Sequence, residues 1–452
     1  MLDMLSAIAH DLDLPAPADG AVRFASPGNL HSAFAVTEMA GVSIAAAGLA
    51  IAALIEQQAG ECRRVLVDRR LAAFWFASSL RPQRWQPPPL WDPIAGDYQT
   101  RDGWIRLHTN APHHRAIAEQ ILGPATDRDG MARRVLSWTA GELEQAIVEN
   151  GGCAAQMRSW QQWSNHPQGL AVNAEPLIRR QVFDAEGSRI WPGHPERPLA
   201  GVRVLDLTRI LAGPIATRLL AGFGAEVLRI DPPDWQEPGV VPEVTLGKRC
   251  ARLDLRDADD RRVFERLLAQ ADILVHGYRT DALERLGYGD AQRRMMNPAL
   301  VDVSLNAYGW TGPWRLRRGF DSLVQMSTGI AHAGMRWQQA SRPVPLPVQA
   351  LDHATGYLMA AAAIRGLSER LATGRGSLAR LSLARTAKWL EEQGTVADDL
   401  PLAAETQADL GFRREHTPWG PAQRLKPPLQ MLGTLLHWDR GACELGSSEA
   451  CW

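Results

Sequence analysis

From residue 202 onward, short strands rich in Val, Leu and Ile alternate with helical segments, and this alternation limits the possible folds more than any other feature. Helical sequences such as TRLLAGFG and DADDRRVFERLLAQ separate the strand-like segments. Alternation of this kind predicts parallel βαβ units and a doubly wound sheet, with a ligand crevice at the carboxyl ends of the strands. The strand-like segments are VRVLDL, AEVLRID, ARLDL, ADILVHGY and ALVDVSLNAYG, within residues 202–309.

The rest of the chain predicts two further regions. Prolines and glycines in IWPGHPERPLAG, residues 190–201, mark a boundary before the βαβ pattern. We therefore expect an N-terminal region over 1–195 and an α/β domain over 196–395. The N-terminal region reads as a smaller α+β unit with a helix over 37–58. Residues 396–452 are proline-rich and weakly periodic, which predicts an extended C-terminal tail lying over a neighbour.

Composition excludes several classes of function. The 452 residues carry 49 basic and 50 acidic side chains, so no overall positive field attracts nucleic acid or an anionic membrane. The five cysteines lack a CxxC pair, which favours reduced thiols in a cytoplasmic protein. The N-terminus lacks the basic start of a signal peptide. The most apolar window, residues 42–55, is shorter than a membrane span and predicts a buried core helix.

An internal similarity becomes visible when the sequence is shifted by 314 positions. The shift aligns EMAGVSIAAAGLAIAALIEQQAGECRRVLVDRRLAAFW with DHATGYLMAAAAIRGLSERLATGRGSLARLSLARTAKW. Glu38 then faces Asp352, and each alanine-rich helix is followed by a glycine, a short strand and a tryptophan. The identity is low, so either a partial duplication or similar composition accounts for it.

Asp352 lies in VQALDHATG, between an apolar run and an alanine-rich helix. At a helix start its carboxylate would accept hydrogen bonds from free N–H groups and interact favourably with the helix dipole, which is the ordinary role of an N-cap. The same position also presents an anion as a nucleophile above the sheet, with backbone donors nearby for an oxyanion. The local sequence leaves both interpretations open.

Other motifs are weaker. GFGAE lacks the GxGxxG spacing and follows a helix, so it gives no support for a nicotinamide cofactor. Lys248, Arg249 and Arg279 lie near predicted strand ends, where each is either a solvated charge or a phosphate contact. The histidines of LHTNAPHH lack partners at ligand spacing, so we expect no metal site.

Taken in order, GVRVLDLTRILAGPIATRLLAGFGAEVLRIDPP, LGKRCARLDLR, ADILVHGYRTDALERLGYG and LDHATGYLMAAAAI resemble the class III CoA-transferase family. The resemblance implies a Rossmann-like domain, no permanently bound cofactor, and acyl-CoA and a small carboxylic acid as substrates. It implies that Asp352 is the catalytic carboxylate and that Arg279 contacts CoA, with Lys248 and Arg249 as weaker contacts. The family forms interlocked dimers, so a homodimer is expected.

The N-terminal region resembles the small-domain half of the same family, so the chain reads as a permuted or partly duplicated member. Glu38 would then be a second, degenerate site. Racemases of the family place a histidine where this chain has Phe320, which favours CoA transfer over racemisation. A racemase or isomerase using Asp352 with His353 or His332 remains an alternative, as does a non-catalytic CoA-binding protein.

Overall fold

A computed structural model describes residues 1–278, 281–394 and 400–452. Its largest sheet has seven strands in the order β10-β9-β8-β11-β12-β13-β7, and neighbouring strands are parallel except for the antiparallel pair β13 and β7. The predicted doubly wound α/β fold is thereby confirmed. The strands are β7 (Arg179–Phe183), β8 (Arg203–Leu207), β9 (Glu226–Asp231), β10 (Lys248–Arg252), β11 (Ile273–His276), β12 (Val301–Asn306) and β13 (Gly376–Ser382).

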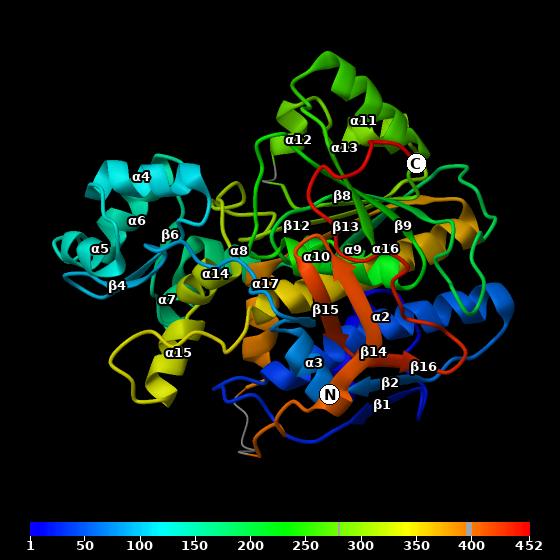
Figure 1. The fold of residues 1–452 in the computed structure, drawn as a ribbon, viewed down its shortest axis with the longest axis horizontal. Helices are drawn as coiled ribbons and strands as arrows, with labels where there is room; N and C mark the ends of the chain where they lie inside the picture. Colours follow the sequence, from blue (N-terminus) through cyan, green and yellow to red (C-terminus); the bar gives the residue numbers. More distant parts are fainter. Residues whose placement is uncertain (279–280, 395–399) are drawn as a thin grey trace.

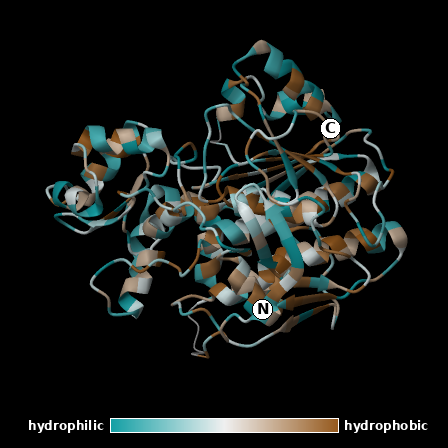
Figure 2. Cartoon of the chain, in the orientation of Figure 1, coloured by the Kyte–Doolittle hydropathy of each residue, from teal (hydrophilic) through white to brown (hydrophobic). Residues whose placement is uncertain are grey.

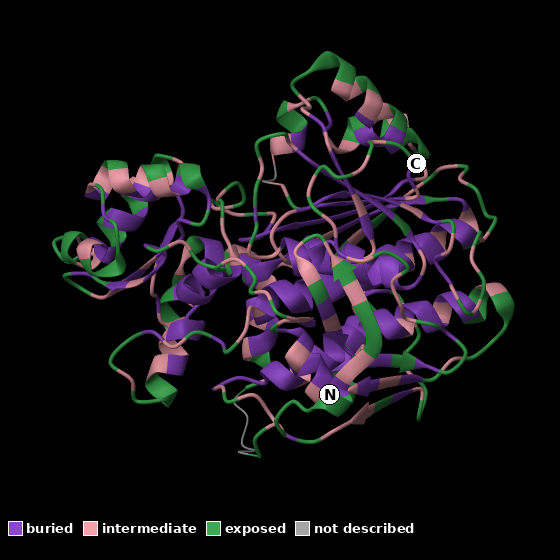
Figure 3. Ribbon diagram, in the orientation of Figure 1, coloured by how far each residue is buried: buried purple, intermediate pink, exposed green. Residues whose placement is uncertain are grey.

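Helices cover both faces of this sheet (Figure 1). One face carries α11 (Ala258–Gln270), α12 (Ala282–Arg285) and α13 (Asp290–Met296). The other face carries α9 (Ala212–Gly222) and α16 (Ala350–Thr373), which pack against each other. Helix α2 (Val36–Ala59) packs on the far side of α16. Figure 3 shows α2, α9 and α16 largely buried, so they form the central layer of the protein.

Helix α2 is long and apolar enough to cross a membrane by length and composition alone. In the structure, however, 83% of its most apolar window is buried inside the protein. Its apolar surface contacts α16 on one side and a small sheet on the other, and Figure 2 shows both neighbours as largely hydrophobic. The prediction of a buried core helix is confirmed. The small sheet consists of β1 (Val22–Ala25), β2 (Val65–Asp68) and β16 (Leu429–Met431).

The two segments that a shift of 314 residues aligns fold alike. Both α2 and α16 have 24 residues, and each ends at a glycine in the left-handed conformation, Gly60 or Gly374. Helix α3 (Arg69–Trp75) follows β2, as α17 (Leu383–Glu392) follows β13. Strand β2 pairs with β1 in parallel and with β16 in antiparallel orientation. Strand β13 pairs in the same way with β12 and β7. This equivalence exceeds what similar composition explains; a duplication as its origin stays a prediction.

A smaller domain extends to the left of the large sheet in Figure 1 and has its own hydrophobic core. Helices α14 (Asp321–Ser327) and α15 (Ile330–Trp337), from the second half of the chain, complete it, because Leu323 and Met326 pack against Cys153 and Ala155. Its other elements are β4 (Gly96–Gln99), β5 (Trp104–Leu107), β6 (Ala154–Gln156), α4 (Pro112–Leu122), α5 (Arg128–Val135), α6 (Ala140–Glu149), α7 (Trp160–Asn165) and α8 (Pro167–Asn173).

The predicted boundary at residue 195 therefore does not divide the structure. Helix α2 belongs to the main hydrophobic core, and β7, which precedes the boundary, completes the large sheet. Helix α2 joins the larger domain by packing against α16, and β7 joins it by pairing with β13. The two domains are thus each built from both halves of the chain.

The C-terminal region folds back over the described part of the same chain. Strands β14 (Leu410–Thr417) and β15 (Gly420–Leu425) form a sheet with β3 (Leu80–Pro82), and β16 pairs with β2. Residues 432–452 then run without a helix or strand to Trp452, whose indole N–H donates to the carbonyl of Leu267 at 3.1 Å. The remaining elements are α1 (Leu2–Asp11), α10 (Val241–Val244) and a short 3-10 helix at Gln407–Asp409.

Candidate active site

A cavity of about 320 Å³ lies where the carboxyl ends of β8, β11 and β12 meet the small domain. This is the crevice that the topology of a doubly wound sheet predicts. Asp352 forms part of its wall, together with groups from both domains. The other lining residues include Arg209–Gly213 after β8, Gly277 and Tyr278 after β11, Asn306 and Ala307 after β12, His113 and His114 on α4, and Arg317–Phe320.

Asp352 lies in the first turn of α16, with only 8% of its surface exposed. It does not cap the helix: the N-cap is Gln349, and no side-chain cap bond is made there. The capping prediction was therefore wrong. Instead, the backbone N–H of Asp352 donates to a carboxylate oxygen of Asp321 at 2.9 Å. Asp321, from the small domain, thus accepts a hydrogen bond from a backbone N–H at the start of α16. The Asp352 carboxyl group therefore remains available to the cavity.

The two carboxyl groups influence each other's ionisation. Burial raises the pKa of Asp352 well above its ordinary value, and the neighbouring charge of Asp321 raises it further. Burial also raises the pKa of Asp321 to about 6, although that carboxyl accepts hydrogen bonds from backbone N–H groups and Gln325. Two such groups titrate as a pair, and the charge of one disfavours ionisation of the other. The hydrogen bonds to Asp321 favour its anion, whereas burial and the Asp321 charge both favour the protonated form of Asp352.

A strained turn follows β8. Ile210 has a φ of 65°, which is unfavourable for a β-branched residue and occurs where surrounding contacts enforce it. Its N–H donates to Glu237 at 2.8 Å, which holds the turn. The preceding residue, Arg209, places its guanidinium 4.3 Å from the ring centre of Trp235 and 4.8 Å from that of Tyr278. The turn thus fixes a cation in the cavity wall.

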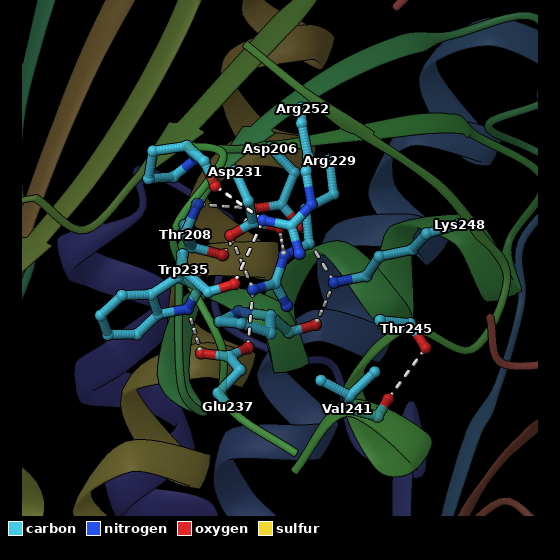
Figure 4. Close-up of polar contacts among 12 residues, drawn as sticks. Asp206, Thr208, Arg229, Asp231, Trp235, Glu237, Val241, Thr245, Lys248 and Arg252 are labelled. Atoms are coloured by element: carbon cyan, nitrogen blue, oxygen red, sulfur yellow. Dashed lines mark hydrogen bonds and ion pairs between the residues drawn. The ribbon is translucent and has the colours of Figure 1, made fainter. Parts of the chain in front are cut away.

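A buried network of charges supports this wall (Figure 4). Arg229, on β9, donates to Asp231 at 2.8 Å and to Glu237 at 2.6 Å. Glu237 in turn accepts the indole N–H of Trp235 at 2.9 Å as well as the Ile210 amide. Removing one charge from such a network would leave its partner buried without compensation. The network therefore positions Ile210 and Trp235 relative to the sheet.

Lys248 was predicted as a CoA contact, but its side chain lies in the protein core beneath the cavity wall. Its ammonium donates to Asp206 at 2.9 Å and to the carbonyl of Pro214 at 3.0 Å, and both charged side chains are 0% exposed. Burial lowers the pKa of Lys248, partly offset by the charge of Asp206. The structure thus contradicts a ligand contact by this side chain, because its charge is already compensated within the core.

Two of the other predicted residues, Arg249 and Glu38, lie apart from the cavity of Asp352. Arg249 lies on β10, the edge strand of the sheet, and does not line the cavity. Arg279 lies outside the described residues. Glu38 forms an ion pair with Arg69 at 2.6 Å and also lies outside the cavity, so its carboxylate has a structural partner.

Two histidines of LHTNAPHH, His113 and His114, line the cavity, and His108 lines the neighbouring one. Burial lowers the pKa of His108 well below its ordinary value and that of His114 to about 3. The ring of His108 stacks on Phe320 with centres 3.7 Å apart. Across the residues described, we find no cluster of three or more His, Cys, Asp or Glu side chains that would suit a metal ion.

Neither histidine proposed as a second base lines the cavity. His353 is 1% exposed and stacks on Phe76 at 5.0 Å, and burial lowers its pKa to about 3. His332 lies on α15. Arg209, Tyr278 and Asp321 are the site residues that the motifs did not identify. A signal existed for the first two, because each directly follows a predicted strand whose carboxyl end borders the crevice.

Comparison with known proteins identifies the fold that carries this site. Residues 199–418 match CoA-transferase family III. This segment, just under half of the chain, is therefore similar to that family. The match includes β8 to β13 and Asp352, so it covers the large sheet except for β7, and most of the cavity wall. The family resemblance drawn from the sequence motifs is confirmed.

Several characterised relatives are similar to this chain. An acyl-CoA transferase of Gibberella moniliformis is 30% identical over 305 residues, which cover 61% of this chain and 53% of the relative. The succinyl-CoA:glutarate CoA-transferase of Mus musculus is 33% identical over 211 residues, 42% of this chain and 48% of the relative. The chain thus spans about half the length of the curated relatives it matches.

Among solved structures, Rv3272 of Mycobacterium tuberculosis is similar with 30% identity and a TM-score of 0.40, over 43% of this chain and 58% of that chain. A CAIB/BAIF family protein from Brucella suis has 23% identity and a TM-score of 0.38, over 50% of this chain and 65% of that chain.

Proposed function

We propose that this protein transfers CoA from an acyl-CoA thioester to a carboxylic acid through a covalent intermediate on Asp352. The observation that carries the proposal is the placement of Asp352. Its carboxyl group lies in a cavity at the carboxyl ends of the strands, within the region that matches CoA-transferase family III. The helix that bears it is capped by Asp321, so its own oxygens are not used for structure.

The chemistry follows from a carboxylate nucleophile in an enclosed site. Ionised Asp352 attacks the thioester carbonyl, which forms a mixed anhydride and releases CoA as a thiolate. The thiolate attacks the aspartyl carbonyl, forms an aspartyl thioester and releases the donor acid. An acceptor carboxylate then attacks this thioester, which forms a second mixed anhydride and releases the CoA thiolate. The thiolate attacks the acceptor carbonyl of this anhydride, which gives the acceptor thioester and frees the Asp352 carboxylate. The buried cavity protects the anhydrides from water during these steps.

An exchange assay tests the proposal. The enzyme is incubated with a CoA thioester and the isotopically labelled free acid of the same acyl group. We expect label to enter the thioester only when both substrates are present. Hydrolysis of the thioester without exchange would contradict the proposal. Deuterium uptake at the α carbon without a free acid would instead indicate the racemase alternative, which the positions of His353 and His332 do not favour.

The pH dependence of exchange depends on the pair Asp321 and Asp352. The ionised form of Asp352 is the reactive one, so activity rises with pH through the apparent pKa of the pair. Because burial and the Asp321 charge raise the pKa of Asp352, the acid limb of the profile is expected at a higher pH than for an ordinary aspartate. Asp321→Asn keeps an acceptor for the Asp352 amide but removes the neighbouring charge. We expect this variant's acid limb to shift to lower pH, and an unshifted limb would contradict the pairing.

Arg209 and Tyr278 also border a neighbouring cavity, of about 330 Å³, at the carboxyl ends of β9 and β10. Arg256 lines it as well, beside Asp231, Asp234 and Asp254, and we infer that Arg209 and the Tyr278 ring contact the nucleotide of CoA there. We expect Arg209→Gln to raise the KM for acyl-CoA about tenfold, the effect of losing one charge-assisted hydrogen bond. Arg249→Gln, on the edge strand outside both cavities, is the matched control and should keep its KM. An equal change in the KM for acyl-CoA in both variants would contradict the assignment of Arg209 as a CoA contact.

The homodimer and the cytoplasmic location remain predictions from the sequence. Size-exclusion chromatography with light scattering measures the first.

A further inference from the structure

A second cavity, of about 210 Å³, lies between the two domains beside the cavity of Asp352. We call it the side chamber. The two cavities share Ile210, Trp235 and Phe320, so these three residues form the wall at which they meet. The remaining lining residues are Pro89–Asp92, His108, Asn110 and Ala111 from the small-domain side and Gln236–Val240 from the large domain.

The side chamber offers no positive charge to a ligand. Among its described lining residues there is no Lys or Arg. Three arginines pack near it. Arg209, which lines the cavity of Asp352, lies 4.3 Å from the ring centre of Trp235, and the other two are ion-paired. Arg115 donates to Asp92 at 2.9 Å, and Arg106 donates to Asp97 at 2.7 Å while lying over the ring of Trp91. The chamber's polarity is therefore set by groups other than cations.

The acidic side chains of the lining also have partners within the protein already. Asp92 accepts from Arg115 and from the Thr109 hydroxyl at 2.8 Å. Glu237 is held by Arg229, as described above. Burial keeps the His108 ring neutral by lowering its pKa, and Phe320 covers one face of that ring. A carboxylate entering the chamber would lose its hydration and gain no ion pair, and two fixed carboxylates would repel it.

The entrance of the side chamber is apolar as well. Leu90 and Trp91 are 59% and 38% exposed, although both are large hydrophobic residues. Their segment is held against the large domain at Gly239, where a Cβ atom would lie 2.8 Å from the carbonyl oxygen of Pro89. An apolar ligand group would cover part of this exposed surface, which is favourable in water.

We propose that the side chamber binds the acyl group of the thioester, and that this group is apolar and about as large as a phenyl ring or a six-carbon chain. The inference rests on the proposed function, because that function places the thioester carbonyl at Asp352. The size follows from the volume: 210 Å³ exceeds the roughly 150 Å³ apolar cavity that holds benzene in an engineered protein. A dicarboxylic acyl group such as succinyl would place its free carboxylate among groups that disfavour it.

The test compares acetyl-, phenylacetyl- and succinyl-CoA in the exchange assay, each with its own labelled acid. For the unmodified protein we expect kcat/KM for phenylacetyl-CoA to exceed that for succinyl-CoA at least about tenfold. Leu90→Lys introduces a cation at the chamber entrance. This variant is expected to lose about tenfold with phenylacetyl-CoA, gain with succinyl-CoA and change little with acetyl-CoA. Leu136→Lys, directly after α5 and 53% exposed, is the matched control.

The outcomes separate the two proposals. Exchange with acetyl-CoA, combined with a preference for succinyl-CoA, would overturn the side chamber as an apolar acyl site and leave the proposed function intact. An unchanged selectivity in Leu90→Lys would overturn it as well. Absence of exchange with all three thioesters would overturn the proposed function itself, and the acyl inference with it.

Discussion

Asp352→Asn is expected to reduce CoA exchange on the order of 10³-fold or more, because the amide has no anion with which to attack the thioester. The size of the effect follows from the role: losing a nucleophile removes the covalent route, and only binding and positioning remain. The substitution keeps the shape of the side chain, and the Asp352 position is capped through its backbone amide rather than its carboxyl group. The folded structure is therefore expected to persist, with an unchanged circular dichroism spectrum.

A matched control separates charge loss from nucleophile loss. Asp129→Asn removes an exposed carboxylate on α5, far from the cavity lining, and should retain full activity. If Asp352→Asn retained a tenth or more of the exchange rate, Asp352 would not be the nucleophile.

Lys248→Met is expected to lower the free energy of unfolding by about 3–5 kcal/mol, the cost of leaving one member of a buried ion pair without its partner. The ammonium of Lys248 compensates Asp206, and both side chains are fully buried. Methionine fills most of the lysine's volume, so the loss reports charge rather than packing. Denaturant unfolding, followed by circular dichroism, measures the change.

The double variant Lys248→Met, Asp206→Asn provides the control. It removes both charges, and it is expected to recover a large part of the lost stability because no uncompensated ion remains buried. A Lys248→Met protein of normal stability with a raised KM for CoA would contradict the structural role and restore the ligand contact predicted from the sequence.

The fold was largely predictable because its signals are local. Strands β8, β9, β11 and β12 coincide with short runs rich in Val, Leu and Ile, whereas β10, at Lys248–Arg252, begins before the predicted strand ARLDL. The domain boundary was not predictable in this way. Helix α2 and strand β7 join the large domain through contacts with α16 and β13, more than 170 residues away in either case. No local pattern encodes which distant surface such an element covers.

The residues of the candidate site divide in the same way, into those that the sequence indicates and those that depend on distant contacts. Asp352 was identified through ordered motifs, but its partner Asp321 was not, because their contact depends on how the small domain packs against α16. Arg209 owes its place to the positive φ of Ile210, which a sequence does not reveal. Lys248 shows the opposite error: a basic residue at the start of a strand suggested a ligand contact, whereas Asp206 on another strand takes up its charge.

The most direct measurement of the central proposal is a chemical trap of the aspartyl intermediate. The protein is incubated with phenylacetyl-CoA or acetyl-CoA in the presence of hydroxylamine, digested and examined by mass spectrometry. We expect Asp352 to be converted to its hydroxamate, in a reaction that requires the thioester. An unmodified Asp352 in protein that still exchanges CoA would contradict a covalent route through this residue.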